Sequence, residues 1–147
     1  AIGNGASVSA NNTMVLGNAT TSVAIGSSET PGGYKFSVAG KMIAEGVKVR
    51  TRAKGWPDYV FEPTYELPKL ETVAAYVKEN KHLPEIPSAA EVEKEGIDLA
   101  DMNAQLLKKV EELTLYMIAQ NKIIQELQNQ IKIINEKISL KQSTDAK

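Results

Sequence analysis

An apolar stripe with heptad spacing runs through the C-terminal part of the sequence. It advances in alternating steps of three and four residues, and no Gly or Pro interrupts the chain from Asp98 to Lys141. With Val110 taken as heptad position a, the a positions are Val110, Met117, Ile124, Ile131 and Ile138, and the d positions are Leu113, Gln120, Leu127, Ile134 and Lys141. Heptads sustained over this length predict one long helix, capped at its start by Asp98, that forms a coiled coil.

The stripe continues upstream of Val110 with a change in spacing. Leu99, Met102 and Leu106 extend it with one additional four-residue step, a stutter that locally unwinds a supercoil. The predicted helix would be roughly 65 Å long at ~1.5 Å per residue. The rest of a chain of 147 residues is too small to cover such a stripe, so we predict that further copies of the same chain cover it.

The heptad residues bear on how many copies associate. Ile at a with Leu at d favours two strands, and Ile at both positions favours three, so the mixed set leaves both numbers open. Tyr116 and Ile123 widen the apolar face into position g, and a polar Gln120 layer at d could fix the register, which favours a parallel homotrimer. The predicted trimer interface consists of Val110, Leu113, Met117, Gln120, Ile124, Leu127, Ile131, Ile134 and Ile138.

The N-terminal part of the chain has a different composition. Residues 1–33 hold six of the ten glycines and a single charged residue, Glu29. Short apolar stretches followed by Gly with Asn or Ser recur around Gly3, Gly17 and Gly26. Gly and Asn permit tight turns, and short strands that recur between such turns are typical of a β-roll or β-solenoid. We therefore predict a β-roll stalk over residues 1–33.

The segment between these two regions predicts a small mixed β/α collar over residues 34–97. Strands are expected at 34–39, 41–44 and 47–52, an extended aromatic segment at 56–63, and a helix at about 70–80. Ser88 and Glu91 form a capping-box pattern for a short helix that Gly96 ends. The predicted fold class is therefore mixed and fibrous: an intertwined homotrimer with an N-terminal β-roll, a collar, and a parallel coiled coil with a frayed tail over residues 98–147.

Candidate chemistry is sparse. The chain has a formal net charge of −1, no Cys and one His, His82, which we interpret as a packed turn residue. A zinc site of the usual kind cannot be assembled from one such chain, and no nucleophile, phosphate-loop or dinucleotide motif is present. We expect no enzymatic activity, no cofactor and no metal. No apolar run approaches the ~20 residues that span a bilayer, so direct membrane insertion is not expected.

One basic row is a candidate binding surface. Lys48, Arg50 and Arg52 alternate with apolar residues, and Trp56 follows. The row could contact an anionic glycan or another anion, or it could be a solvated strand face paired with nearby glutamates. Trp56 could be a carbohydrate platform or could fill an interface between protomers. Specific binding of nucleic acid is not indicated.

Two resemblances connect these patterns to fibres. Ser22–Gly26 resembles the core of the head repeats of trimeric autotransporter adhesins. Residues 34–127 resemble the C-terminal segment of tail-fibre-type proteins of bacteria and phages, on four stretches: Phe36–Lys41, Trp56–Phe61, His82–Ser88 and Leu106–Thr114. In other fibres that place is taken by an endosialidase-type intramolecular chaperone, which cuts itself off at a Ser-Asp pair. This sequence has no such dipeptide, so self-cleavage is not implied.

The resemblances imply a structural role. We expect a segment of a trimeric fibre, either a tail fibre or a surface adhesin, that trimerises and positions an adhesive or receptor-binding element. The alternative is a chaperone-like folding and trimerisation module without self-cleavage. The implied partners are two further copies of the chain and a cell-surface glycan or receptor, and the implied location is extracellular, at a cell surface or on a phage or injection particle. Because Ala1 falls within a repeat, we expect a piece of a longer protein.

Overall fold

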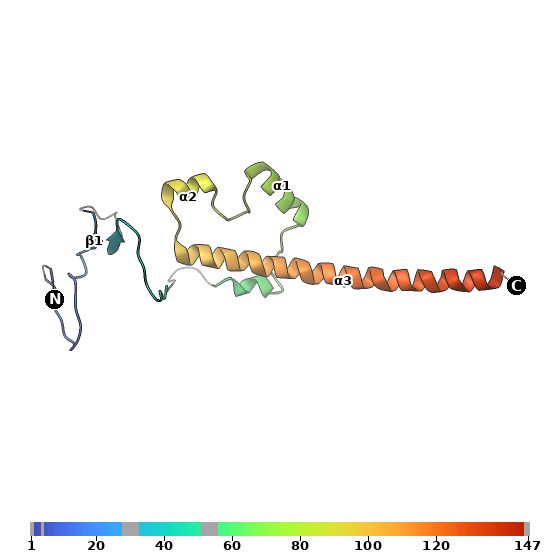
Figure 1. Ribbon diagram of the computed structural model, residues 1–147, viewed down its shortest axis with the longest axis horizontal. Helices are drawn as coiled ribbons and strands as arrows, with labels where there is room; N and C mark the ends of the chain where they lie inside the picture. The colour runs from blue at the N-terminus through green and yellow to red at the C-terminus, as the bar shows by residue number, and fades with distance from the viewer. Residues whose placement is uncertain (1, 4, 28–32, 51–55, 146–147) are drawn as a thin grey trace. The chain divides into compact units, whose positions relative to one another are not determined.

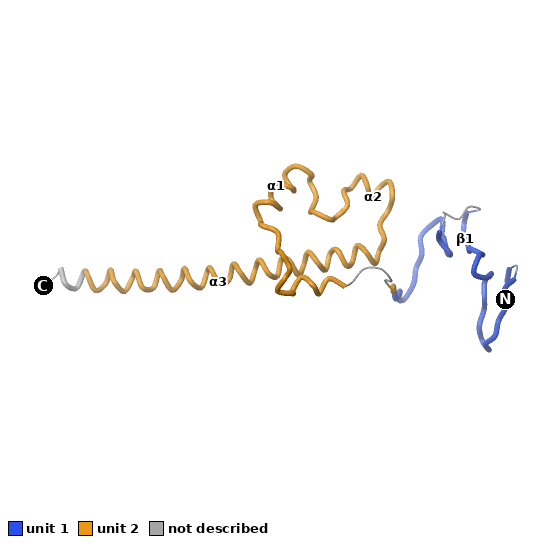
Figure 2. Tube along the Cα trace, turned by 180° about the vertical axis from the view of Figure 1, so that it is seen from behind, with its two compact units in different colours: residues 1–48 blue, residues 49–147 orange. Residues whose placement is uncertain are grey.

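The computed structural model describes residues 2–3, 5–27, 33–50 and 56–145, with side chains described as far as Lys141. Their contacts divide the chain into two units, residues 1–48 and residues 49–147 (Figure 2). The elements are β1 (Val23–Ile25), β2 (Phe36–Val38), the 3-10 helix η1 (Pro57–Phe61), α1 (Leu70–Asn80), α2 (Ala89–Glu95) and α3 (Leu99–Asp145) (Figure 1). The predicted division at residues 33 and 97 stays a prediction.

The first unit contains two short parallel pairings. β1 pairs with β2 in the register Val23 to Phe36 and Ile25 to Val38. An isolated parallel bridge joins Ile2 to Leu16, with the Ile2 N–H donating to the Val15 carbonyl oxygen at 2.8 Å. Strand structure in the described part of this unit is limited to these pairings.

The predicted β-roll over residues 1–33 is therefore wrong. The turns that suggested it do form: Gly17 has φ +75°, a Cβ there would meet the Thr21 side chain, and Asn18 Oδ1 accepts from the Thr20 and Thr21 N–H groups. A roll needs consecutive coils stacked so that each buries the apolar row of the next. The apolar side chains at these positions, among them Ile2, Leu16 and Ile25, remain exposed, so turn chemistry alone did not produce a stack.

The middle of the chain is less extended than predicted. The strand expected at 34–39 is confirmed as β2, but 41–44 and 47–50 form no strand, and residues 51–52 lie outside the described residues. The aromatic segment is the 3-10 helix η1 rather than extended chain. Pro57 is its first residue, where the fixed φ of proline suits a helix start and its missing N–H costs nothing.

The three predicted helices are confirmed, and so are the two ends of α1, the two ends of α2 and the start of α3. α1 spans Leu70–Asn80 and stops where Lys81 adopts φ +65°. Ser88 and Glu91 form the expected capping box at the start of α2, and Gly96 ends that helix. Asp98 Oδ1 accepts from the Ala100 and Asp101 N–H groups at 2.8 and 2.9 Å, which caps α3. With 47 residues, α3 is about 70 Å long.

The second unit is organised around the first third of α3. η1 packs against α3 on one side, while α1, the loop over residues 81–88 and α2 form an arch on the other (Figure 1). The tightest burial is at the η1 side: Val60 is 1% exposed, Pro57 is buried, and Glu111 and Glu112 are 7% and 6% exposed. Val60 is the one fully buried apolar side chain of the described residues.

The cap at Asp98 gives the first prediction. Asp98→Ala removes the acceptor for two N–H groups of α3, so we expect the free energy of unfolding to fall by about 1 kcal/mol. Asp98→Asn keeps an acceptor oxygen and should stay close to the parent. Urea unfolding followed by circular dichroism at one protein concentration measures both variants. Parent-like stability of the Ala variant would show that the cap contributes nothing.

Candidate functional site

α3 has a covered face and an open face where the rest of the second unit packs on it. Residues at heptad positions b, c, f and g are partly or fully buried by the unit's own residues: Ala104, Gln105, Lys108, Lys109, Glu111, Glu112, Leu115 and Tyr116. The stripe residues Leu106, Val110 and Leu113 are exposed, whereas Met102, further upstream in the stripe, is partly buried. The chain therefore folds onto the outward side of its own helix and leaves the predicted interface side free.

The open face continues without a break to the end of the stripe. Val110, Leu113 and Met117 each expose more than half of their side-chain area, and all residues from Met117 to Lys141 are exposed. All nine residues of the predicted interface therefore lie on uncovered surface of one helix. We refer to this row, from Val110 to Ile138, as the seam.

The positions that flank the seam carry few charges. The e positions are Thr114, Asn121, Gln128 and Asn135, all uncharged. In a parallel coiled coil the g residues of one helix face the e residues of the next. Ion pairs between g and e are therefore not available to this helix.

The covered face carries a cluster of charges that attaches the arch to α3. Lys108 Nζ lies 2.7 Å from both carboxylate oxygens of Glu85, and Lys109 Nζ lies 3.0 Å from Glu85 Oε2. Lys109 Nζ is also 3.0 Å from Glu112 Oε2, and the Tyr65 hydroxyl donates to Glu112 Oε1. Residues from three separate stretches of the chain thus meet at the same level of α3.

The electrostatics of this cluster follow from its contacts. Burial alone would raise the pKa of the Glu85 carboxyl, but hydrogen bonds from Lys108 and Lys109 outweigh it and lower that pKa. The Glu85 interactions therefore contribute stability in full above the ordinary value of 4.5, and lose it as the pH falls through the lower folded-state pKa. Burial, and then the hydrogen bond to Glu112, raise the pKa of Tyr65, so its phenol stays protonated and remains a donor.

Glu85 occupies a backbone conformation that glutamate rarely adopts. Its φ is +68°, and the Ile86 N–H donates to the Leu83 carbonyl oxygen at 3.2 Å across the turn that contains it. With Pro84 before it, Glu85 stands at the turn position that usually requires Gly. A residue held there against its preference indicates that the ion pairs to Lys108 and Lys109 compensate the strain.

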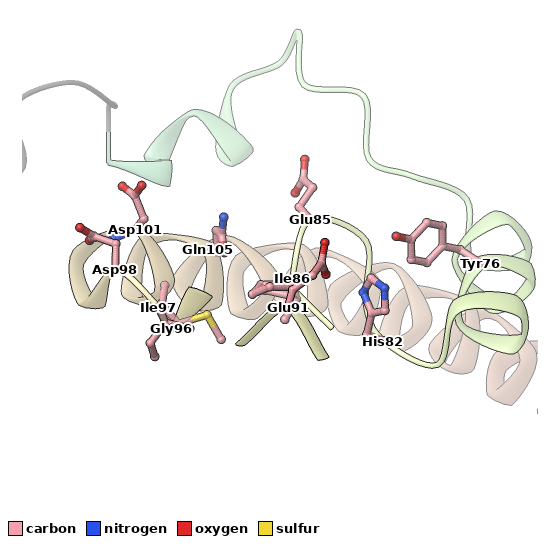
Figure 3. A pocket seen from close by; sticks show the side chains of 12 residues that line it. Tyr76, His82, Glu85, Ile86, Glu91, Gly96, Ile97, Asp98, Asp101 and Gln105 are labelled. Carbon is pink, nitrogen blue, oxygen red and sulfur yellow. The ribbon is translucent and has the colours of Figure 1, made fainter. Parts of the chain in front are cut away.

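An open hollow of about 430 Å³ lies between the arch and the start of α3 (Figure 3). Its acidic side chains already have structural partners: Glu91 caps α2, Asp98 caps α3, and Glu85 binds two lysines. The His82 ring packs edge-on against Tyr76 with ring centroids 5.6 Å apart, as the interpretation of a packed turn residue requires. Within the described ranges no group of three or more His, Cys, Asp or Glu side chains could hold a metal ion.

The basic row is only partly described. Lys48 and Arg50 are exposed and form no ion pair with the described residues, and Arg52 lies outside the described residues. Trp56 is exposed and immediately precedes η1. Lys48 belongs to the first unit, while Arg50 and Trp56 belong to the second. The suggested anion or glycan contact stays a prediction.

Sequence reasoning missed the charge cluster. Lys108 and Glu112 stand four residues apart, a spacing that predicts an ion pair on a helix. Glu85 and Tyr65 lie 23 and 47 residues from their partners, however, and nothing in the pattern relates such distant positions. The only local signal was Pro84 followed by a charged residue where a turn favours Gly.

Comparisons with protein-family models, with curated proteins and with solved structures found no match to this chain. In the part of the chain that the structure describes, no helix is both long and apolar enough to cross a membrane.

The strain at Glu85 is testable with two variants. Glu85→Gly and Glu85→Ala both remove the ion pairs, but only Ala retains a Cβ in the left-handed region. We expect the Ala variant to be less stable than the Gly variant by about 1 kcal/mol, measured by urea unfolding at one protein concentration. Equal stability of the two would show that the turn does not hold residue 85 at positive φ.

Proposed function

We propose that this chain is a structural segment of a homotrimeric fibre, which associates through the seam of α3 and positions an adhesive or receptor-binding element. The observation that carries the proposal is the division of α3 into two faces. Over residues 104–116 the chain's own residues cover positions b, c, f and g, while the apolar a and d residues stay exposed there and the row continues, uncovered, to Ile138.

The energetics favour covering the seam. Eight of its nine residues are apolar and about half exposed. Burying the remainder contributes about 1 kcal/mol for each, or roughly 8 kcal/mol for each chain. The part of α3 beyond Tyr116 has no cover from its own chain, and an isolated helix gains little stability in water. A second and third copy present the same seam at the same spacing, so they are the partners that fit it best.

Three chains suit the seam better than two. Position d holds Ile134 as well as leucines, and position g holds the exposed Ile123, which would lie at the margin of a wider core; Tyr116, also at g, is partly covered by the chain itself. Gln120 interrupts the apolar row once, and a single polar layer disfavours helices shifted by a heptad. A parallel arrangement follows, because Gln120 then meets its own copies.

The proposed fibre role follows from what a parallel trimer would do to the upstream part of each chain. A parallel bundle brings three copies of the upstream unit together in one register, outside the cell or on a phage or injection particle. Chain association and folding are then coupled, since the seam is stable only when it is covered. The resemblance of residues 34–127 to tail-fibre segments points in the same direction.

The second candidate is a folding and trimerisation module that acts during assembly and does not adhere. It is favoured by the arch and η1, which attach to α3 through residues of the same chain and need no partner. Deleting residues 98–147 separates the two. If the module acts in assembly, the upstream fibre fails to fold without it, while fibre that has already folded binds its target normally.

Ile131 and Ile133 give a matched test of the seam. They expose 57% and 50% of their surface in one chain, but only Ile131 is at position a. We expect Ile131→Asp to reduce the mass from about 48 kDa, three times 16.0 kDa, towards that of one chain, because a buried unpaired charge is strongly unfavourable. Ile133→Asp should leave the mass unchanged. Light scattering at low micromolar concentration measures both.

Two outcomes would contradict association through the seam. A parent chain with the mass of a monomer would end the proposed assembly. If Ile131→Asp and Ile133→Asp lowered the mass equally, association would not depend on the a and d positions.

The uncharged e positions predict weak salt dependence. Because no g-to-e ion pairs are available, raising NaCl from about 50 to 500 mM should leave the trimer mass unchanged and should not lower its thermal midpoint. Dissociation at high salt, measured by light scattering across that range, would show that charges hold the chains together.

A further inference from the structure

Glu111 is a buried carboxylate without a complete set of partners. It lies on α3 beside η1, is 7% exposed, and its Oε2 atom is buried with no hydrogen-bond partner. Buried polar groups are almost always hydrogen-bonded, because an unsatisfied one carries its full desolvation cost. The buried Oε2 atom of Glu111, which lacks a hydrogen-bond partner, therefore requires a physical explanation.

The neighbouring Glu112 shows what a satisfied carboxylate looks like in the same interface. It is equally buried, at 6% exposed, yet one oxygen accepts from the Tyr65 hydroxyl and the other from Lys109 Nζ. The available cations are used there, since Lys108 and Lys109 both bind Glu85. The same stretch of α3 thus carries one carboxylate with partners and one with an oxygen left over.

The surroundings of Glu111 are acidic rather than basic. Asp58, in the first turn of η1, interacts with it unfavourably. The other ionisable groups of the elements packed around this part of α3 include Tyr59 of η1 and Tyr116 of α3, together with the cluster described above: Tyr65, Glu85, Lys108, Lys109 and Glu112. Because Oε2 is shielded from solvent, a hydrated cation could reach it only if η1 moved away. A proton needs no such opening.

We propose that Glu111 is a proton-binding latch: η1 docks on α3 more tightly when the Glu111 carboxyl is protonated, and loosens when it ionises. Acidification would then fasten the segment that begins at Trp56 to the long helix. The latch lies within one chain, so it does not depend on how many copies associate.

The direction of the pH dependence follows from the interface. Burial first, and then the charge of Asp58, raise the pKa of Glu111 above its ordinary value of 4.5. The folded chain therefore holds this proton to higher pH than the unfolded chain does. The contribution to docking is complete below pH 4.5 and is lost as the pH rises through the folded-state pKa, which is opposite to the behaviour of Glu85.

A direct test is titration of the Glu111 carboxyl carbon by NMR in the full chain, with Glu111→Gln used to assign the signal. The latch requires a midpoint above 4.5. A midpoint at or below that value would overturn the proposal, whatever the variants do to stability.

Unfolding experiments test the effect on docking. Trp56 is the only tryptophan and immediately precedes η1, so its fluorescence reports whether this segment is docked. We expect Glu111→Gln to lower the equilibrium constant for unfolding by at least about threefold at pH 7.5, with tenfold corresponding to one pKa unit. The difference should shrink as the pH falls and vanish well below 4.5, where the carboxyl is protonated in both the folded and the unfolded chain. Asp58→Asn should act in the same direction with a smaller effect.

Glu126→Gln is the matched control, because Glu126 lies on the exposed part of the same helix. It should behave as the parent at both pH values, with protein concentration held fixed. A Glu111→Gln variant that is no more stable than the parent at pH 7.5, or a control that gains the same stability, would contradict the latch.

Discussion

The apolar seam of α3 is exposed in one chain, and the stability of the helix beyond Tyr116 depends on that seam being removed from water. The seam has no cover from its own chain between Val110 and Ile138, while the helix that bears it is about 70 Å long. Such a row on a helix without tertiary cover provides no stability until something packs on it. In the proposed assembly, association with identical chains supplies that cover, and the heptad spacing suits it.

The attachments of η1 and the arch determine which face of the first third of α3 stays open. Glu85 binds Lys108 and Lys109, Tyr65 binds Glu112, and η1 packs beside Glu111, so every attachment lies on the outward positions of the helix. Glu85 adopts a strained backbone at that attachment, which indicates that its ion pairs outweigh the cost. Attached in this way, η1 and the arch leave the seam uncovered.

The sequence predicted the helical elements well because their signals are local. The ends of α1, the capping box at Ser88, the stop at Gly96 and the cap at Asp98 each depend on a few neighbouring residues. The β-roll failed because Gly and Asn specify turns, whereas a roll depends on packing between successive coils. η1 was missed because Pro57 fits a helix start as well as an extended strand. The contacts of Glu85 and Tyr65 with α3 could not be predicted from the sequence, because they join residues that are far apart along the chain.

Hydrogen exchange of the backbone amides of residues 117–138, measured at two protein concentrations, tests the covered seam most directly. The account predicts slow exchange throughout this stretch, with protection that decreases on dilution as chains separate. Exchange that is fast at both concentrations, while the amides of α3 beneath the arch remain protected, would show a bare single helix and would contradict the account.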